Sequence, residues 1–159
     1  MAKYLVTGGY GFIGSHLCDA LLLRGDTVRI LDDLSTGNIA NVAGEHEFIC
    51  GDVGDRNIVL KAMEGVQGCF HLAAVASVEK SNQDWSGTHR SNQTGSVNVF
   101  DAARQSPPIS VVYASSAAVY GDNANTPLVE SVPIAPLTAY GADKAGSELH
   151  GRIATLVHG

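Results

Sequence analysis

Short apolar runs alternate along the chain with stretches whose apolar residues recur at helical spacing. The runs predict buried strands at 4–8, 27–33, 47–52, 68–74 and 109–116. Helical periodicity predicts further crossover helices at 55–64 and 87–104. Strands that alternate with helices indicate an α/β fold, a doubly wound parallel sheet of about five strands with helices on both faces.

Two further segments have the periodicity of amphipathic helices. The first lies between the first two strands and ends at Gly25, a typical C-terminal cap; its apolar face consists of Ile13, Leu17, Ala20 and Leu21. The second ends near Gly159, and its apolar face consists of Ala142, Ala145, Leu149, Ile153 and Leu156. Residues 75–86 and 121–137 fit neither period, and we expect long, irregular loops there, which in a compact domain are usually functional.

Composition narrows the class of protein. The 159 residues suit one domain, and the formal net charge of -6 without a basic stretch argues against nucleic acid or an anionic membrane surface as partner. Cys18, Cys50 and Cys69 fall in no metal-ligand spacing and lie in apolar surroundings, so we expect reduced, buried thiols and no metal. No apolar run is long enough to span a membrane and no signal region follows Met1, so a soluble, cytoplasmic protein is expected.

The first strand runs into the glycine-rich stretch TGGYGFIG, which contains Gly9-x-Gly11-x-x-Gly14 and, in overlapping register, Gly8-x-x-Gly11-x-x-Gly14. Glycines at such a strand–helix turn let the backbone approach a pyrophosphate, which the amides at the helix N-terminus can bind. Asp32 closes the second strand, where a carboxylate can bind both ribose hydroxyls of an adenosine and repel a 2'-phosphate. This pattern favours NAD over NADP, although a glycine turn and a strand-end aspartate also occur without a cofactor.

Two more acidic residues follow strand ends and allow two interpretations each. Asp33 is either a cofactor contact or a solvated turn residue. Asp52 ends the third strand, where it either accepts a hydrogen bond from an adenine amino group or caps the helix that starts near Asp55.

A serine pair and a tyrosine–lysine pair carry the candidate chemistry. The stretch SSAAVYG from Ser115 follows the fifth strand, at the sheet edge where doubly wound proteins bind ligands, although serines there also satisfy local backbone groups. Tyr140 and Lys144 are four residues apart and share a helical face. A lysine cation beside a tyrosine lowers the cost of the phenolate and yields a general base, but a solvated helix pair has the same spacing.

Taken together, these motifs resemble the extended short-chain dehydrogenase/reductase superfamily, in particular its NAD-dependent sugar-nucleotide 4-epimerases. The resemblance covers the whole chain and rests on TGGYGFIG, LDDLSTGN, GDVGD, FHLAAVASV, SNQTG, YASSAAVYGD and PLTAYGADK, in the order and spacing of that family. It implies that residues 1–159 form an NAD-binding Rossmann domain.

The resemblance also implies a role for individual residues. The pyrophosphate turn would comprise Gly8, Gly11, Phe12, Ile13 and Gly14. The adenosine would be bound by Asp32, Asp33, Leu34, Ser35, Thr36, Gly37, Asp52 and Val53. The path to the nicotinamide ribose would be lined by Leu72, Ala73 and Ala74, and Asn92 would steady the active-site helix. Ser116 would be the catalytic serine, Tyr140 the base and Lys144 the residue that binds the nicotinamide ribose and tunes the tyrosine, with Ser77 and Ser115 as candidate substrate contacts.

The implied mechanism is oxidation of the C4 hydroxyl of a nucleotide-sugar by NAD, after which the 4-keto sugar turns over and takes the hydride back on its other face. Ala117 and Ala118 stand where the related 4,6-dehydratases carry an acid and a base, which counts against dehydration. Ala76 in the loop after the fourth strand is more typical of epimerases of N-acetylated or uronic sugar nucleotides, and decarboxylases share much of this pattern.

Proteins of this family usually run to about twice this length, and their second half supplies most of the sugar-nucleotide pocket. We therefore expect residues 1–159 to be the cofactor-binding half, without the C-terminal substrate-binding part. The alternatives are another sugar-nucleotide oxidoreductase or decarboxylase, and a dinucleotide-binding module without turnover. The family often dimerises through the helices that match 87–104 and 138–158, so a homodimer is expected.

Overall fold

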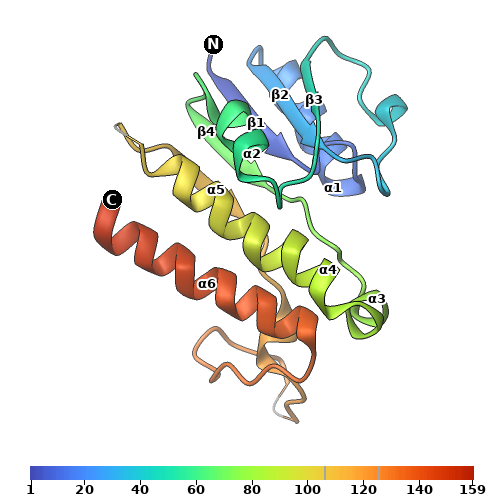
Figure 1. Ribbon diagram of the computed structural model, residues 1–159, viewed down its shortest axis with the longest axis vertical. Coiled ribbons are helices and arrows are strands. Elements are labelled where there is room, and N and C mark those ends of the chain that lie inside the picture. Colours follow the sequence, from blue (N-terminus) through green and yellow to red (C-terminus); the bar gives the residue numbers. More distant parts are fainter. Residues whose placement is uncertain (106, 125) are drawn as a thin grey trace.

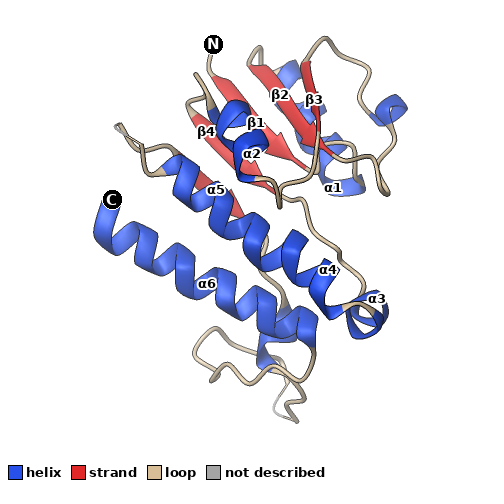
Figure 2. Cartoon of the chain, in the orientation of Figure 1, coloured by secondary structure: helices blue, strands red, loops and turns tan. Residues whose placement is uncertain are grey.

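The computed structural model describes residues 1–105, 107–124 and 126–159. Its centre is a parallel sheet of five strands in the order β3-β2-β1-β4-β5 (Figures 1 and 2). The strands are β1 (Lys3–Thr7), β2 (Thr27–Asp32), β3 (Glu47–Cys50), β4 (Gly68–His71) and β5 (Ser110–Tyr113). The predicted doubly wound α/β fold is confirmed. Each strand ends one to three residues earlier than predicted, because the chain leaves the sheet there to form loops at the carboxyl edge.

Helices cover both faces of the sheet (Figure 1). They are α1 (Phe12–Leu23), α2 (Arg56–Met63), α3 (Val78–Gln83), α4 (Trp85–His89), α5 (Gly95–Ala103) and α6 (Ala139–His158). Neighbouring residues of a strand point to opposite faces. Leu5 therefore joins the apolar core formed with α2 and α5, whereas Val6 joins the core formed with α1.

The helix predicted at 87–104 is divided in the structure. It consists of part of α4, a π-helical turn at Arg90–Thr94, and α5. The three pieces form a nearly continuous rod that lies beside α6 in Figure 1. Single π-helical turns are frequent at functional sites, because they alter which side chains a helix presents to its neighbours.

The prediction of a long, irregular loop at 75–86 is wrong. Residues 75–86 contain α3 and the start of α4. The side chains of Ser77 and Asp84 cap these helices by accepting hydrogen bonds from the backbone N–H groups of Lys80 and Gly87. Such short helices depend on caps and tertiary contacts and carry little apolar periodicity. The described residues of 121–137 contain no helix or strand, as predicted.

Two helices bury a different face from the predicted apolar one. In α1, Ile13 and Ala20 are exposed, and the buried residues are Gly14, Ser15, Cys18 and Leu21. In α6, the side chains of Leu149, Ile153 and Leu156 are exposed to between 57% and 74%. The buried residues of α6 are Gly141, Asp143, Lys144, Ala145 and Ser147. Small and polar residues of α6 therefore face the rest of the domain, and its apolar stripe faces outwards.

The cysteines are all free, and Cys18 and Cys69 are buried as predicted. Cys50 is exposed, so the prediction of three buried thiols is wrong for this residue. It lies at the end of β3, the outer strand on that side of the sheet, where no further strand covers it. Within the described residues, no helix is both long and apolar enough to cross a bilayer.

Candidate functional site

The glycine-rich turn joins β1 to α1 in a conformation that requires glycine. Gly8 has a positive φ of 68°, and a Cβ there would lie 2.8 Å from Ala73 Cα. A Cβ on Gly14 would lie 2.2 Å from the carbonyl oxygen of Gly8. The backbone N–H of Gly11 donates to that same oxygen over 3.1 Å. The turn is therefore closed tightly, which brings the start of α1 to the edge of the sheet.

The first turn of α1 is free to bind an anion. Its N-cap is Gly11, which has no side chain to accept hydrogen bonds from the first N–H groups of the helix. Phe12 and Ile13 occupy this turn and are 80% and 66% exposed. Free amides and the positive end of the helix dipole suit a pyrophosphate, so the residues present fit the predicted dinucleotide.

Asp32 connects the glycine turn to the loop after β2. Its side chain is largely buried, and its two oxygens accept hydrogen bonds from the backbone N–H groups of Tyr10 (3.0 Å) and Leu34 (2.9 Å). A carboxylate oxygen can accept two hydrogen bonds, so each oxygen retains one acceptor position. The geometry thus fixes an anionic acceptor beside Gly8 that is able to bind a diol.

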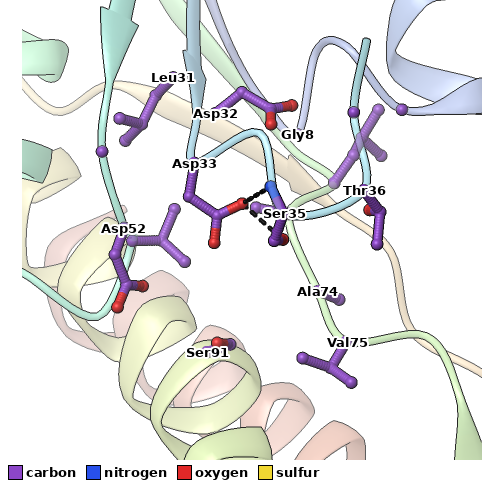
Figure 3. Close-up of a pocket in the computed structure, with 16 residues that line it drawn as sticks. Gly8, Leu31, Asp32, Asp33, Ser35, Thr36, Asp52, Ala74, Val75 and Ser91 are labelled. Carbon is purple, nitrogen blue, oxygen red and sulfur yellow. Dashed lines mark hydrogen bonds between the residues drawn. The ribbon is translucent and has the colours of Figure 1, made fainter.

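The two ambiguous acids have different roles in the structure. Asp33 accepts hydrogen bonds from the N–H and hydroxyl groups of Ser35, which makes it a turn residue, and it also lines the pocket (Figure 3). Asp52 does not cap α2, because Asp55 accepts from the first N–H groups of that helix. Asp52 instead pairs with Arg90 of the π-helical turn, with 3.1 Å between Oδ2 and Nη2.

These strand ends surround one open pocket (Figure 3). Twelve of the predicted residues line it: Gly8, Gly11, Asp32, Asp33, Ser35, Thr36, Gly37, Asp52, Val53, Leu72, Ala73 and Ala74. Its remaining lining residues were not predicted: Leu31, Gly51, Val75 and Ser91. Gly51 and Ser91 lie within the motifs GDVGD and SNQTG, so these motifs could have identified both residues as part of the cofactor site.

Phe12, Ile13, Gly14, Leu34 and Asn92 belong to the predicted cofactor site but do not line this pocket. Gly14 and Leu34 support its wall through the close contact and the hydrogen bond described above. Asn92 holds the loop after β4, because its side chain accepts from the N–H of Val75 (2.8 Å) and donates to its carbonyl (3.2 Å).

A buried chain of hydrogen bonds stands behind this wall, and sequence reasoning missed it. The hydroxyl of Thr7 accepts from the N–H groups of Leu72 and Ala73, and it lies 2.7 Å from Nδ1 of His71. On the other side of the ring, Nε2 lies 3.1 Å from the hydroxyl of Ser96, which donates to the carbonyl of Asn92.

These partners determine the direction of the bonds at His71. The hydroxyl of Ser96 donates to the carbonyl of Asn92, so it accepts a hydrogen bond from Nε2–H of His71. The other ring nitrogen, Nδ1, therefore accepts a hydrogen bond from the hydroxyl of Thr7. Burial, with a smaller contribution from Lys144, lowers the pKa of His71 to about 3. The ring is thus neutral and links β1 and β4 to α5 behind the pocket.

The predicted catalytic residues lie outside the pocket, where α6 packs against the end of β5. Lys144 is buried, and its Nζ donates to the carbonyl of Ala114 over 2.8 Å. This ammonium lies 6.0 Å from the centre of the Tyr140 ring. Burial lowers the pKa of Lys144, and Asp143 opposes that shift. Ser116 follows Ala114 closely, and its hydroxyl accepts from the N–H of Ala118 (3.2 Å).

The two weaker substrate candidates are both engaged in local contacts. Ser115 donates a hydrogen bond to the carboxylate of Glu148, one helical turn after Lys144. Ser77 caps α3. Together, Lys144 and Glu148 hold two consecutive residues of the loop that carries Ser116, so α6 positions this loop relative to Tyr140.

Known proteins resemble this chain in both sequence and fold. Residues 4–153 match the family model described as the NAD dependent epimerase/dehydratase family. The UDP-glucose 4-epimerase of Corynebacterium glutamicum is 38% identical over 146 residues, which cover 89% of this chain and 43% of that protein. The chain spans about half the length of the curated relatives it matches.

Two solved structures have closely similar backbones. The UDP-N-acetylglucosamine 4-epimerase of Methanobrevibacter ruminantium, in complex with UDP-N-acetylmuramic acid, superposes with a TM-score of 0.92 at 35% identity, over 99% of this chain and 51% of that one. The UDP-glucose 4-epimerase of Thermus thermophilus, in complex with NAD, gives a TM-score of 0.92 at 35% identity, over 98% and 51% of the two chains.

Proposed function

Since the chain belongs to the NAD dependent epimerase/dehydratase family, we propose that residues 1–159 form the NAD-binding domain of a nucleotide-sugar 4-epimerase. The observation that carries the proposal is the combination of two sites at one sheet edge. The first is the pocket lined by the glycine turn, Asp32 and Asp52. The second is the group of Tyr140, Lys144 and Ser116 at the next strand end. A binding module without turnover would need only the first.

NAD fits the pocket in three respects. The uncapped first turn of α1 suits its pyrophosphate, and Asp32 retains acceptor positions for the adenosine ribose. The carboxylate of Asp52 at the far end suits the adenine amino group. When bound, NAD would accept a hydride from C4 of the sugar and return it.

The residues of the second site would move the proton. Tyr140 would take the proton of the C4 hydroxyl, and the positive charge of Lys144 would lower the cost of the phenolate. The hydroxyl of Ser116 would bind the same oxygen of the sugar and keep it oriented as the 4-keto sugar turns over. Return of the proton from Tyr140 would complete the cycle.

The substrate is proposed from the relatives, because UDP-sugars appear in the names of several. The intact protein should be incubated with UDP-glucose and with UDP-N-acetylglucosamine, and the products identified by NMR. We expect the C4 epimer to form, and Tyr140→Phe to abolish its formation while NAD remains bound. Tyr113→Phe is the matched control, since this tyrosine of β5 packs on Phe100 of α5 and carries no proposed chemistry. Full activity of Tyr140→Phe, or a permanently oxidised product, would contradict the proposal.

We also propose a homodimer that buries the apolar face of α6. Leu149, Ile153 and Leu156 project outwards from this helix, and together they leave an apolar stripe in water. Sedimentation equilibrium should give a mass of two chains, and Ile153→Glu should shift the protein to the monomer. A monomer at every concentration of the unaltered protein would refute this proposal.

A further inference from the structure

The helix that carries Tyr140 and Lys144 also buries an acidic residue between them, Asp143. This residue is only 7% exposed. One of its carboxylate oxygens lies 2.7 Å from Nδ1 of His89 in α4. The other oxygen is buried and has no hydrogen-bond partner among the described residues. Burial of a polar oxygen without a partner is costly and uncommon, so this arrangement calls for a reason.

Lys144 is equally buried and has no acidic partner in direct contact within the part of the chain that the structure describes. Its ammonium donates to a neutral carbonyl of Ala114, which stabilises a cation less than a carboxylate does. Burial lowers the pKa of Lys144, and the opposing influence is the charge of Asp143. The lysine thus depends on its neighbour in sequence for electrostatic support.

The other titratable groups around this lysine do not supply that support. His71 of β4 is neutral, because burial lowers its pKa to about 3. Tyr140, whose ring centre lies 6.0 Å from the ammonium, is the base of the proposed function. Glu148, one turn further along α6, accepts a hydrogen bond from Ser115. Of the acidic residues near Lys144 on α6, Asp143 is therefore the one that is adjacent in the chain and has a buried oxygen without a hydrogen-bond partner among the described residues.

His89 anchors Asp143 from a separate helix. Its Nδ1 lies within hydrogen-bond distance of the carboxylate, so the ring holds Asp143 in place from α4. His89 is 58% exposed in its side chain, so water solvates the ring and not the carboxylate. The pair thus holds a buried carboxylate in place, one residue before Lys144.

We propose that Asp143, anchored by His89, is a positioning residue that keeps Lys144 positively charged beside Tyr140. The catalytic consequence rests on the proposed function, but the coupling between the two side chains is a property of the protein without substrate. A purely structural link between α4 and α6 would need only a neutral hydrogen-bond acceptor at position 143. It would not need a charged carboxylate with one oxygen buried and unpaired.

The test is an NMR titration of lysine side chains labelled with ¹³C at Cε, in the intact protein with and without NAD. Lys144→Arg assigns the Lys144 signal. We expect Asp143→Asn, which still accepts from His89, to move the titration of Lys144 to lower pH. Asp143→Ser, a smaller neutral residue, should move it in the same direction if the asparagine variant folds poorly. The control is Asp101→Asn in α5, whose carboxylate pairs with Arg56 and Arg104 away from the site.

Unchanged titration of Lys144 in both Asp143 variants would overturn the inference. In the epimerase assay, Asp143→Asn should shift the alkaline limb of the pH profile to lower pH, with kcat at pH 9 reduced roughly tenfold more than at pH 7. Its KM and NAD content should stay close to those of the unaltered protein. Failure of the proposed function is distinguishable, because an inactive protein with a shifted Lys144 signal would retain the coupling and lose only its catalytic meaning.

Discussion

Acidification should destabilise the protein through His71, whose neutral ring is 4% exposed and hydrogen-bonded on both sides. The pKa of this ring is about 3 in the folded state, against an ordinary value of 6.5 that applies to the unfolded chain. Below pH 6.5 the unfolded chain therefore binds a proton that the folded chain does not. The contribution is fully present above pH 6.5 and is lost as the pH falls towards 3.

The size of this loss follows from the two pKa values. Each pH unit below 6.5 lowers the free energy of unfolding by about 1.4 kcal/mol, so the change between pH 7 and pH 5 is about 2 kcal/mol. That is a substantial fraction of the stability of an ordinary domain, about 5–15 kcal/mol. The pH range of interest lies mostly above the titration of ordinary carboxylates, which limits their contribution.

The comparison that isolates His71 is His71→Gln, since an amide also offers an acceptor and a donor but does not titrate. We expect this variant to be less stable than the unaltered protein at pH 7, and the difference to shrink by about 2 kcal/mol at pH 5. Urea unfolding followed by circular dichroism at several pH values measures both. His158→Gln, at the exposed end of α6, is the matched control and should follow the unaltered protein. A stability difference for His71→Gln that stays constant from pH 7 to 5 would refute the buried neutral ring.

Three further changes have clear expected outcomes. Gly14→Ala should cost about 2 kcal/mol or more of stability and weaken NAD binding at least tenfold, because the new methyl group would lie 2.2 Å from the Gly8 carbonyl oxygen. The control, Gly146→Ala, should cost less than about 1 kcal/mol, because its methyl group meets only the movable end of the Gln93 side chain. In the proposed epimerase assay, Glu148→Ala should lower kcat roughly tenfold, whereas Glu148→Gln, which retains an acceptor for the strand-end serine Ser115, should stay near full activity. Cys50 alone should react rapidly with a thiol reagent at pH 8, because burial raises the pKa of the other two thiols to about 12, and three equally fast thiols would contradict this.

The sequence predicted those parts of the fold in which a local structural requirement restricts the residue types directly. Five apolar runs became five strands because a parallel sheet covered on both faces needs continuous apolar segments. The turn at Gly8 was predictable because the residue there has a positive φ and a Cβ would lie 2.8 Å from Ala73 Cα, so little but glycine is tolerated. Asp32 was predictable from its distance to that turn, and it lies beside the turn in the structure.

Other features depend on partners that are remote in the sequence. The buried face of α6 contains the polar residues Lys144 and Asp143. Lys144 is buried with a hydrogen bond to the carbonyl of Ala114, and Asp143 with a contact to His89. Hydrophobic periodicity instead selects the exposed stripe of the same helix. Similarly, nothing local to His71 indicates that two hydroxyl groups, 64 and 25 residues away, would enclose it.

An NMR titration of backbone amides tests directly whether NAD binds in the pocket. We expect saturable binding that shifts the amides of Gly8, Gly11, Asp32 and Asp52, with NADP at least tenfold weaker because Asp32 repels its 2'-phosphate. Absence of saturable binding at about 1 mM NAD, a concentration that detects even weak complexes, would contradict the account. So would shifts confined to residues outside the pocket.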